Sequence, residues 1–206
     1  MGADADHVLS GMGLDPRIGN SFLTPGPGWG GSCFPKDTAT MVHIAAAAGL
    51  ELGFLSQIIE MNDRHIARIA AKVQTSLDGD LAGKRIAVWG LTFKAGTDDL
   101  RSSPALAVLE HLQGAKSSIA AYDPTVTSAL PQAADVDICG DPLHAAAGAD
   151  VLVVLTEWPE FGRIDPTDVA AAMDQRRIVD ARNVLDPAAY RAVGFDVVGV
   201  GTKEPT

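Results

Sequence analysis

A single cysteine in a glycine-rich segment is the first feature of this sequence that could carry chemistry. Four glycines lie within residues 25–31, Cys33 follows, and Asp37 comes four residues later at the start of an alanine-rich run. Glycine has no Cβ, so this backbone can adopt positive φ and approach a ligand closely. Free N–H groups and the dipole at a helix start favour a thiolate. The segment fits a nucleophilic cysteine, and it also fits a glycine-rich turn with a buried structural cysteine.

Helices on both sides must position this segment. Residues 3–11 are expected to form the last turns of a helix, and a second helix is expected over residues 37–49. Asp37 or Thr38 can cap the second helix, so Asp37 has a structural interpretation beside a chemical one. A third helix is predicted from about residue 52 to residue 77, because apolar residues recur there at helical spacing. Its unusual length is compatible with a partner surface and with packing inside its own domain.

Short apolar strands alternate with helices from residue 81 onward. We predict strands at 85–90, 117–122, 136–139, 151–156, 177–181 and 195–200, and helices near 103–113, 142–148, 167–174 and 187–192. This alternation indicates a parallel sheet covered on both faces, with ligands beyond the carboxyl ends of the strands. The predicted class is α/β, with a long central helix region followed by a Rossmann-like parallel sheet. We expect two domains, residues 1–80 and 81–206.

The loop after the first strand lacks the usual dinucleotide fingerprint. It reads GLTFKAGTDD instead of GxGxxG. We therefore do not expect this sheet to bind a dinucleotide by itself.

Composition excludes several classes of partner. The net charge is −10 over 206 residues and there is no basic cluster, which argues against nucleic acid or an anionic membrane as partner. The sequence contains no apolar run long enough to span a bilayer and does not begin with a signal segment. Cys33 and Cys139 occur in unlike contexts, which predicts reduced thiols and a cytoplasmic protein.

The string DPRIGNSFLTPGPGWGGSCFPKD closely resembles the active-site segment of the nucleotide-sugar 6-dehydrogenases, the UDP-glucose/GDP-mannose dehydrogenase family. Three further stretches match that family in the expected order: GLTFKAGTDDLRSSPA, TEW with Phe161 nearby, and DARNVLD. The resemblance runs from about Gly2 to Gly201. It implies the central and carboxyl-terminal portion of such an enzyme without the amino-terminal domain that binds most of the NAD. Since the family's oxyanion-stabilising groups belong to that domain, we expect the isolated chain to be inactive or nearly so.

The resemblance implies oxidation of UDP-glucose to UDP-glucuronate through an aldehyde, with two hydrides passing to two NAD molecules. Cys33 matches the nucleophile, which forms a thiohemiacetal and then a thioester. Asp37 matches a carboxylate that assists water or proton transfer. TEWPEF and DARNVLD look more like the UDP-glucose branch than the GDP-mannose branch, and a UDP-N-acetylhexosamine branch is the nearer competitor. A non-catalytic nucleotide-sugar-binding or dimerisation module is the alternative from another class.

Other positions match the family's binding residues. Arg17 matches an arginine that reaches into the neighbouring subunit's substrate site, while Lys36 and Arg101, together with Cys33, match cofactor-side contacts. The resemblance also implies a homodimer formed through the helix over residues 52–77. The remaining implied substrate contacts are Phe22, Leu23, Thr24, Pro25, Gly26, Gly28, Trp29, Gly30, Phe93, Lys94 and Arg182.

Overall fold

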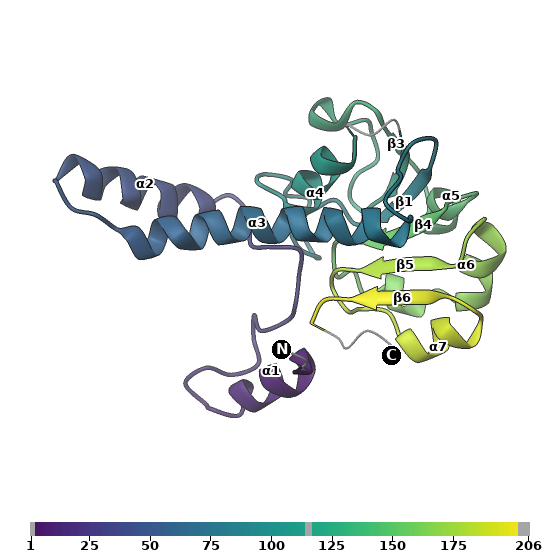
Figure 1. Cartoon of the computed structure of the whole chain (residues 1–206), viewed down its shortest axis with the longest axis horizontal. Helices are drawn as coiled ribbons and strands as arrows, with labels where there is room; N and C mark the ends of the chain where they lie inside the picture. The colour runs from purple at the N-terminus through teal and green to yellow at the C-terminus, as the bar shows by residue number, and fades with distance from the viewer. Residues whose placement is uncertain (1–2, 114–116, 202–206) are drawn as a thin grey trace.

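Three helices precede the sheet in the computed structural model, which describes residues 3–113 and 117–201. Residues 1–2, 114–116 and 202–206, which include the outer ends of both predicted domains, lie outside the described residues. Helix α1 (Ala5–Gly13) is followed by the glycine-rich loop. Helices α2 (Phe34–Ala47) and α3 (Gly53–Ser76) then form a hairpin that projects from the rest of the chain (Figure 1).

The rest of the described chain is a six-stranded sheet with its helices. All strand pairs are parallel, in the order β3-β2-β1-β4-β5-β6. The elements are β1 (Arg85–Trp89), α4 (Pro104–Gln113), β2 (Ser118–Tyr122), η1 (Pro131–Ala133), β3 (Val136–Ile138), α5 (Pro142–Ala146), β4 (Val151–Val154), η2 (Phe161–Arg163), α6 (Pro166–Ala172), β5 (Arg177–Asp180), α7 (Pro187–Ala192) and β6 (Asp196–Gly199).

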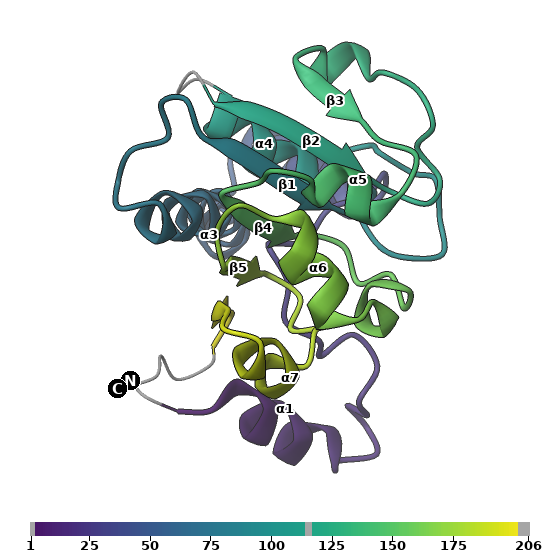
Figure 2. The ribbon, with the colours of Figure 1, turned by 90° about the vertical axis from the view of Figure 1, so that its right-hand side faces the viewer.

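The central strands are buried on both faces, as their continuous apolar runs predict. In β1, Ile86 and Val88 point into the core cluster that also contains α3 and α4. Ala87 and Trp89 point into the second cluster, with α5, α6 and α7. Figure 2 shows the sheet between these two helix layers. The predicted α/β class with helices on both faces is confirmed, and the elements of the sheet region begin and end within two residues of their predicted bounds.

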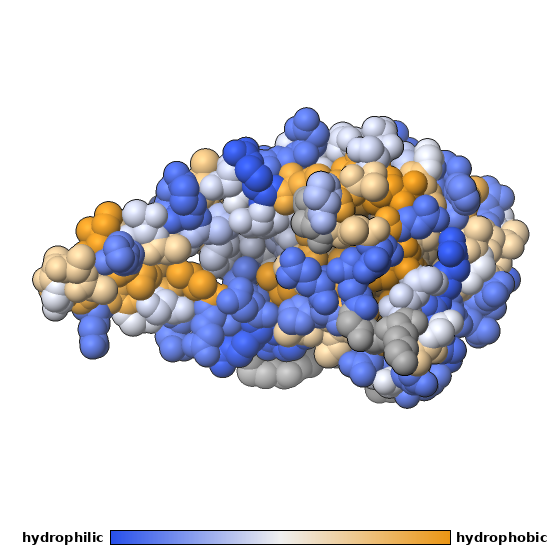
Figure 3. All heavy atoms as spheres, turned by 90° about the horizontal axis from the view of Figure 1, so that it is seen from above, coloured by the Kyte–Doolittle hydropathy of each residue, from blue (hydrophilic) through white to orange (hydrophobic). Residues whose placement is uncertain are grey.

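Helix α3 belongs to two environments. Its carboxyl-terminal half enters the core through residues such as Ile69 and Val73, which are 1% and 0% exposed. Its amino-terminal half runs beside α2, outside the sheet. Apolar side chains gather on this α2–α3 hairpin (residues 34–76; Figure 3). The exposed ones are Phe34, Met41, Ile44, Leu50, Leu52, Phe54 and Met61.

The start of α2 differs from the prediction. The helix begins at Phe34 with Cys33 as its N-cap residue, so the expectation that Asp37 or Thr38 caps it was wrong. Pro35 occupies the first turn, where its missing N–H costs nothing. The Thr38 hydroxyl donates back to the Phe34 carbonyl at 2.8 Å, which is a bond made inside a helix. Asp37 therefore lies in the first turn, without the role of a cap.

Across the described residues, none of the helices combines the length and apolar character needed to cross a membrane.

Candidate active site

The strand order reverses between β1 and β4, and this is the point where open parallel sheets bind ligands. The loops after β1, β4 and β5 emerge at this carboxyl edge of the sheet, and the glycine-rich loop crosses in front of them. A hollow of about 530 Å³, here called the edge hollow, lies between these loops. It is lined by Phe22, Thr24, Gly26, Gly28, Trp29, Gly30, Phe93, Lys94, Glu157 and Arg182.

Most of the predicted substrate contacts line this one hollow, although they come from three distant parts of the sequence. Leu23 and Pro25 do not line it and instead line a second hollow beside α1. Arg17 also lies apart. Its side chain is 87% exposed and forms an ion pair with Asp15, with Nη2 and Oδ2 2.6 Å apart. The expected contact of Arg17 with a neighbouring subunit stays a prediction.

Two residues of α3 hold the glycine-rich loop, and the sequence analysis did not identify either of them. Asn62 makes two bonds to Trp29: its Oδ1 accepts from the Trp29 N–H at 3.0 Å, and its Nδ2 donates to the Trp29 carbonyl at 3.2 Å. His65 Nε2 lies 2.9 Å from the Gly26 carbonyl. Asn62 and His65 are three residues apart, so they share one helix face. That spacing of two polar residues was the available signal.

The glycines next to Cys33 are required by close packing. A Cβ on Gly30 would collide with the Ser102 carbonyl, and one on Gly31 would lie 2.9 Å from the Phe93 ring. Gly31 also has φ +89°, a backbone conformation that is strained for any residue with a side chain. The Gly31 N–H donates to the Ser102 carbonyl at 3.3 Å. The loop thus lies directly against the segments that follow β1.

Cys33 and Asp37 lie together at the start of α2, one helical turn apart. Cys33 is exposed, and its Sγ lies 3.6 Å from the Ser32 hydroxyl. The Asp37 N–H donates to the Cys33 carbonyl at 2.8 Å, and the Asp37 carboxylate pairs with Lys36 at 3.2 Å. Neither Cys33 nor Asp37 lines the edge hollow. The thiol nevertheless comes two residues after Gly31 and stands at a helix N-terminus, a position that suits a nucleophile.

Arg101 lies near Cys33. Its guanidinium forms two bonds with Asp99, Nε to Oδ1 at 2.9 Å and Nη2 to Oδ2 at 2.8 Å. These bonds lower the pKa of Asp99 to about 2 and raise the pKa of Arg101. The charge of Cys33 adds a smaller upward contribution to the pKa of Arg101, because the two groups are close.

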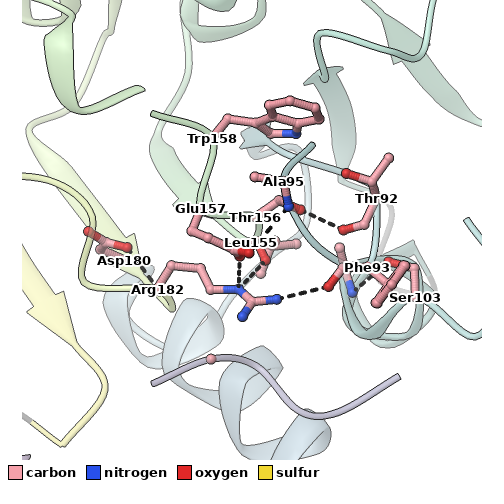
Figure 4. Close-up of polar contacts among 12 residues, drawn as sticks. Thr92, Phe93, Ala95, Ser103, Leu155, Thr156, Glu157, Trp158, Asp180 and Arg182 are labelled. Carbon is pink, nitrogen blue, oxygen red and sulfur yellow. Dashed lines mark hydrogen bonds and ion pairs between the residues drawn. The ribbon is translucent and has the colours of Figure 1, made fainter. Parts of the chain in front are cut away.

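Arg182 is the most strongly held cation of the edge hollow (Figure 4). Its side chain is only 11% exposed. Nε donates to the Leu155 carbonyl at 3.0 Å and lies 3.1 Å from Glu157 Oε2, while Nη2 donates to the Phe93 carbonyl at 3.1 Å. Burial lowers the pKa of Arg182, and the charges of Glu157 and Asp180 act in the opposite direction. The positive charge is thereby held facing the glycine-rich loop, since a Cβ on Gly26 would meet Nη1 at 2.5 Å.

Lys94 supplies a second cation from the loop after β1. It is exposed, and its Nζ lies 5.3 Å from the centre of the Phe93 ring. This distance allows a cation–π contact, which holds the flexible side chain loosely near the edge hollow.

Asp123 lies directly after β2, at the position where dinucleotide-binding sheets carry an acidic residue. In dinucleotide-binding sheets an acidic residue of this region binds a ribose hydroxyl. Asp123 is 1% exposed and accepts bonds from Leu91, Thr92, Thr125 and Trp158. Although burial raises its pKa, the N–H donors of Leu91, Thr125 and Thr92 bring it below the usual value. This carboxylate is therefore occupied by protein donors, and the loop after β1 has no GxGxxG turn. That the NAD site lies elsewhere stays a prediction.

Comparison with known proteins gives a consistent family. Residues 87–187 match the UDP binding domain of the UDP-glucose/GDP-mannose dehydrogenase family, and residues 1–64 match its central domain. The chain therefore belongs to this family.

Individual relatives extend the match. The UDP-glucose 6-dehydrogenase of Rhizobium meliloti (strain 1021) is 40% identical over 202 residues, which is 98% of this chain and 46% of that protein. The solved UDP-glucose dehydrogenase of Pyrobaculum islandicum has a TM-score of 0.80 and 28% identity, covering 98% of this chain and 44% of that one. The UDP-D-ManNAc dehydrogenase of Pyrococcus horikoshii has a TM-score of 0.81 and 28% identity, covering 99% and 46%. The chain spans less than half the length of these relatives.

Proposed function

We propose that this chain carries the nucleophile and the sugar-nucleotide site of an NAD-dependent UDP-glucose 6-dehydrogenase. The observation that supports this most is the edge hollow, where the glycine-rich loop before Cys33 meets the cations Lys94 and Arg182. A diphosphate needs such cations, and backbone groups of a glycine-rich loop suit a sugar. The 40% identity with the R. meliloti UDP-glucose 6-dehydrogenase favours UDP-glucose over other sugar nucleotides.

In the proposed reaction, Cys33 acts on the aldehyde formed at C6 of the hexose. The thiolate adds to the aldehyde carbon and gives a thiohemiacetal; loss of a hydride and of the hydroxyl proton leaves a thioester. Water then cleaves the thioester, releasing the carboxylate and the thiol, and Asp37 takes up or relays the proton of the attacking water. NAD supplies the hydride acceptor for both oxidations, so that UDP-glucose, two NAD⁺ and water become UDP-glucuronate, two NADH and protons.

The cofactor contacts proposed for this chain do not lie on the sheet itself. Lys36, Arg101 and Cys33 lie at or near the start of α2 and are exposed. We assign them to the cofactor side, with most of the NAD site belonging to a domain of the whole protein beyond this chain. The chain alone is then expected to produce no NADH from UDP-glucose and NAD. A rate of NADH formation above the background of a Cys33→Ser variant would contradict this.

Two further assignments belong to the whole protein. The exposed apolar residues of the α2–α3 hairpin support a homodimer formed through α3, in which Arg17 reaches the neighbouring copy. The domain division at residue 80 and a cytoplasmic location are proposed with it.

The test of the substrate site is a calorimetric titration of this chain with UDP-glucose, with GDP-mannose and UDP-N-acetylglucosamine as competitors. We expect binding of UDP-glucose, abolished or weakened at least tenfold by Lys94→Ala and by Arg182→Ala. Arg163→Ala removes an exposed cation outside the edge hollow and serves as the matched control. Equal affinity for both UDP-sugars would limit the site to the uridine end. Tighter binding of UDP-N-acetylglucosamine would move the assignment to that branch, and no binding would contradict a substrate site in this chain.

A further inference from the structure

Glu157 places a negative charge in a hollow that we propose to bind a diphosphate. A carboxylate there repels the ligand, so its presence needs a physical reason. The residue belongs to the TEW turn after β4, and the proposed chemistry uses none of the three side chains of that turn.

The flanking residues of this turn fasten it to the sheet. The Thr156 hydroxyl donates to the Thr92 carbonyl at 2.7 Å, and Trp158 Nε1 donates to Asp123 Oδ2 at 3.1 Å. Thr156 is fully buried. The backbone of Glu157 is thus held on both sides, and its side chain extends from a fixed base into the edge hollow (Figure 4).

The two carboxylate oxygens of Glu157 reach two different loops. Oε1 accepts from the Ala95 N–H at 3.2 Å, in the loop after β1. Oε2 lies 3.1 Å from Arg182 Nε, in the loop after β5. Oε2 is buried. Because the Nε hydrogen is directed to the Leu155 carbonyl, Oε2 accepts no well-aligned hydrogen bond from the described residues. A buried carboxylate oxygen that pairs with a cation but accepts no well-aligned hydrogen bond needs an explanation, and a role in the site supplies one.

We propose that Glu157 is a positioning residue of the sugar-nucleotide site. One carboxylate holds the Arg182 guanidinium against the glycine-rich loop and, through Ala95, fixes the backbone next to Lys94. Both cations of the edge hollow are then placed before a ligand arrives, which reduces the ordering cost of binding. The inference rests on the proposed function, because it assigns a role within the same site.

The substitution that tests this is Glu157→Gln. Glutamine keeps the size of the side chain but offers one oxygen, so it cannot serve both the Ala95 N–H and Arg182. We expect UDP-glucose to bind about tenfold more weakly in calorimetry, which corresponds to about 1.4 kcal/mol. Asp168→Asn removes the same charge from an exposed position on α6 and should leave the affinity unchanged. Tighter binding by Glu157→Gln would show that the carboxylate only repels the ligand and would overturn the proposal.

A double-mutant cycle shows whether Glu157 acts through Arg182. In an Arg182→Ala background, Glu157→Gln should change the affinity less than twofold, whereas independent action predicts the full tenfold loss again. Arg182→Lys provides a second background if the alanine variant is unfolded by circular dichroism.

A measurement without ligand separates this inference from the proposed function. In nuclear magnetic resonance spectra, the Arg182 Nε–H should exchange with water several-fold faster in Glu157→Gln, while the melting temperature shifts by no more than a few degrees. An unchanged Arg182 signal would overturn the positioning role. If the unaltered chain fails to bind any sugar nucleotide, the proposed function falls, and the exchange rate still decides whether Glu157 holds Arg182.

Discussion

The carboxyl edge of the sheet and the α2–α3 hairpin differ in the side chains they present: the edge holds hydrogen-bonded polar groups, and the hairpin exposes apolar ones. At the carboxyl edge, buried polar groups such as Asp123 and Arg182 are each held by several hydrogen bonds from different loops. The hairpin instead presents large apolar side chains to solvent, with Phe54 82% and Ile44 57% exposed. Exposed apolar surface of this extent marks a binding surface. The edge is therefore held together by contacts within this chain, whereas the hairpin leaves apolar side chains exposed, which supports the proposed dimer.

The largest effect should come from breaking the carboxyl edge with Asp123→Asn. The amide group would face N–H and O–H donors that now bond to a carboxylate, leaving several of them unpaired in a buried place. We expect a loss of about 3 kcal/mol in the free energy of unfolding by urea. Asp137→Asn makes the same change at an exposed position of β3 and should cost less than about 0.5 kcal/mol. Equal costs for the two variants would contradict the role given to Asp123.

High pH should destabilise the sheet region, because both tyrosines of the chain lie in it. Burial and a bond to Glu160 raise the pKa of Tyr122 to about 12, and burial also raises the pKa of Tyr190. A tyrosine whose folded pKa exceeds its unfolded value of about 10 stabilises the fold below pH 10, and this stabilisation is lost as the pH rises through 12. Absorbance at 295 nm should show no phenolate formation up to about pH 11. Titration of either tyrosine near pH 10 in the folded chain would count against this burial.

Asn62→Ala should weaken the contact between α3 and the glycine-rich loop. This substitution removes both bonds to the backbone of Trp29, each worth about 1 kcal/mol, without removing a residue from the core. We expect the Trp29 amide to exchange at least fivefold faster, with little change in the global free energy of unfolding. Glu60→Gln alters an exposed residue of the same helix and is the control. Unchanged exchange at Trp29 would mean that the loop is held by other contacts.

The smallest effect on stability should follow from Phe54→Ser on the hairpin. Because Phe54 contributes almost nothing to the buried core, we expect a change within about 0.5 kcal/mol in the unfolding of the monomer. Sedimentation velocity should nevertheless show weaker self-association than in the unaltered chain. A protein that associates as before would place the dimer contact elsewhere.

The sequence predicted the sheet well, since apolar strands and helices alternate there with clear breaks. It also predicted most of the edge hollow, because the resemblance brought together Gly26, Phe93 and Arg182, which lie far apart in the chain. Asn62 and His65 were missed, because polar residues on a long helix also fit a solvent-exposed face. The cap of α2 was misplaced, since a cysteine is an uncommon N-cap residue and Asp37 is a favourable one.

The role of Glu157 was missed for a different reason. The TEW motif served only as a family marker, and a charge in a turn carries no local signal of its partners. Its contacts to Ala95 and Arg182 join residues of loops that are 62 and 25 positions away, and they become visible only when three strands end at one edge.

Helix α3 connects the exposed hairpin, the glycine-rich loop and the buried core. Its carboxyl-terminal half is fixed in the core, its middle holds the glycine-rich loop through Asn62 and His65, and its free half carries Phe54 about 12 Å further along the axis. A displacement of the hairpin would be transmitted to the loop, because Asn62 and His65 join the helix to the loop by hydrogen bonds. Coupling between two binding sites is reciprocal. If association at the hairpin changes the affinity of the loop for a sugar nucleotide by some factor, the sugar nucleotide changes the strength of association by the same factor.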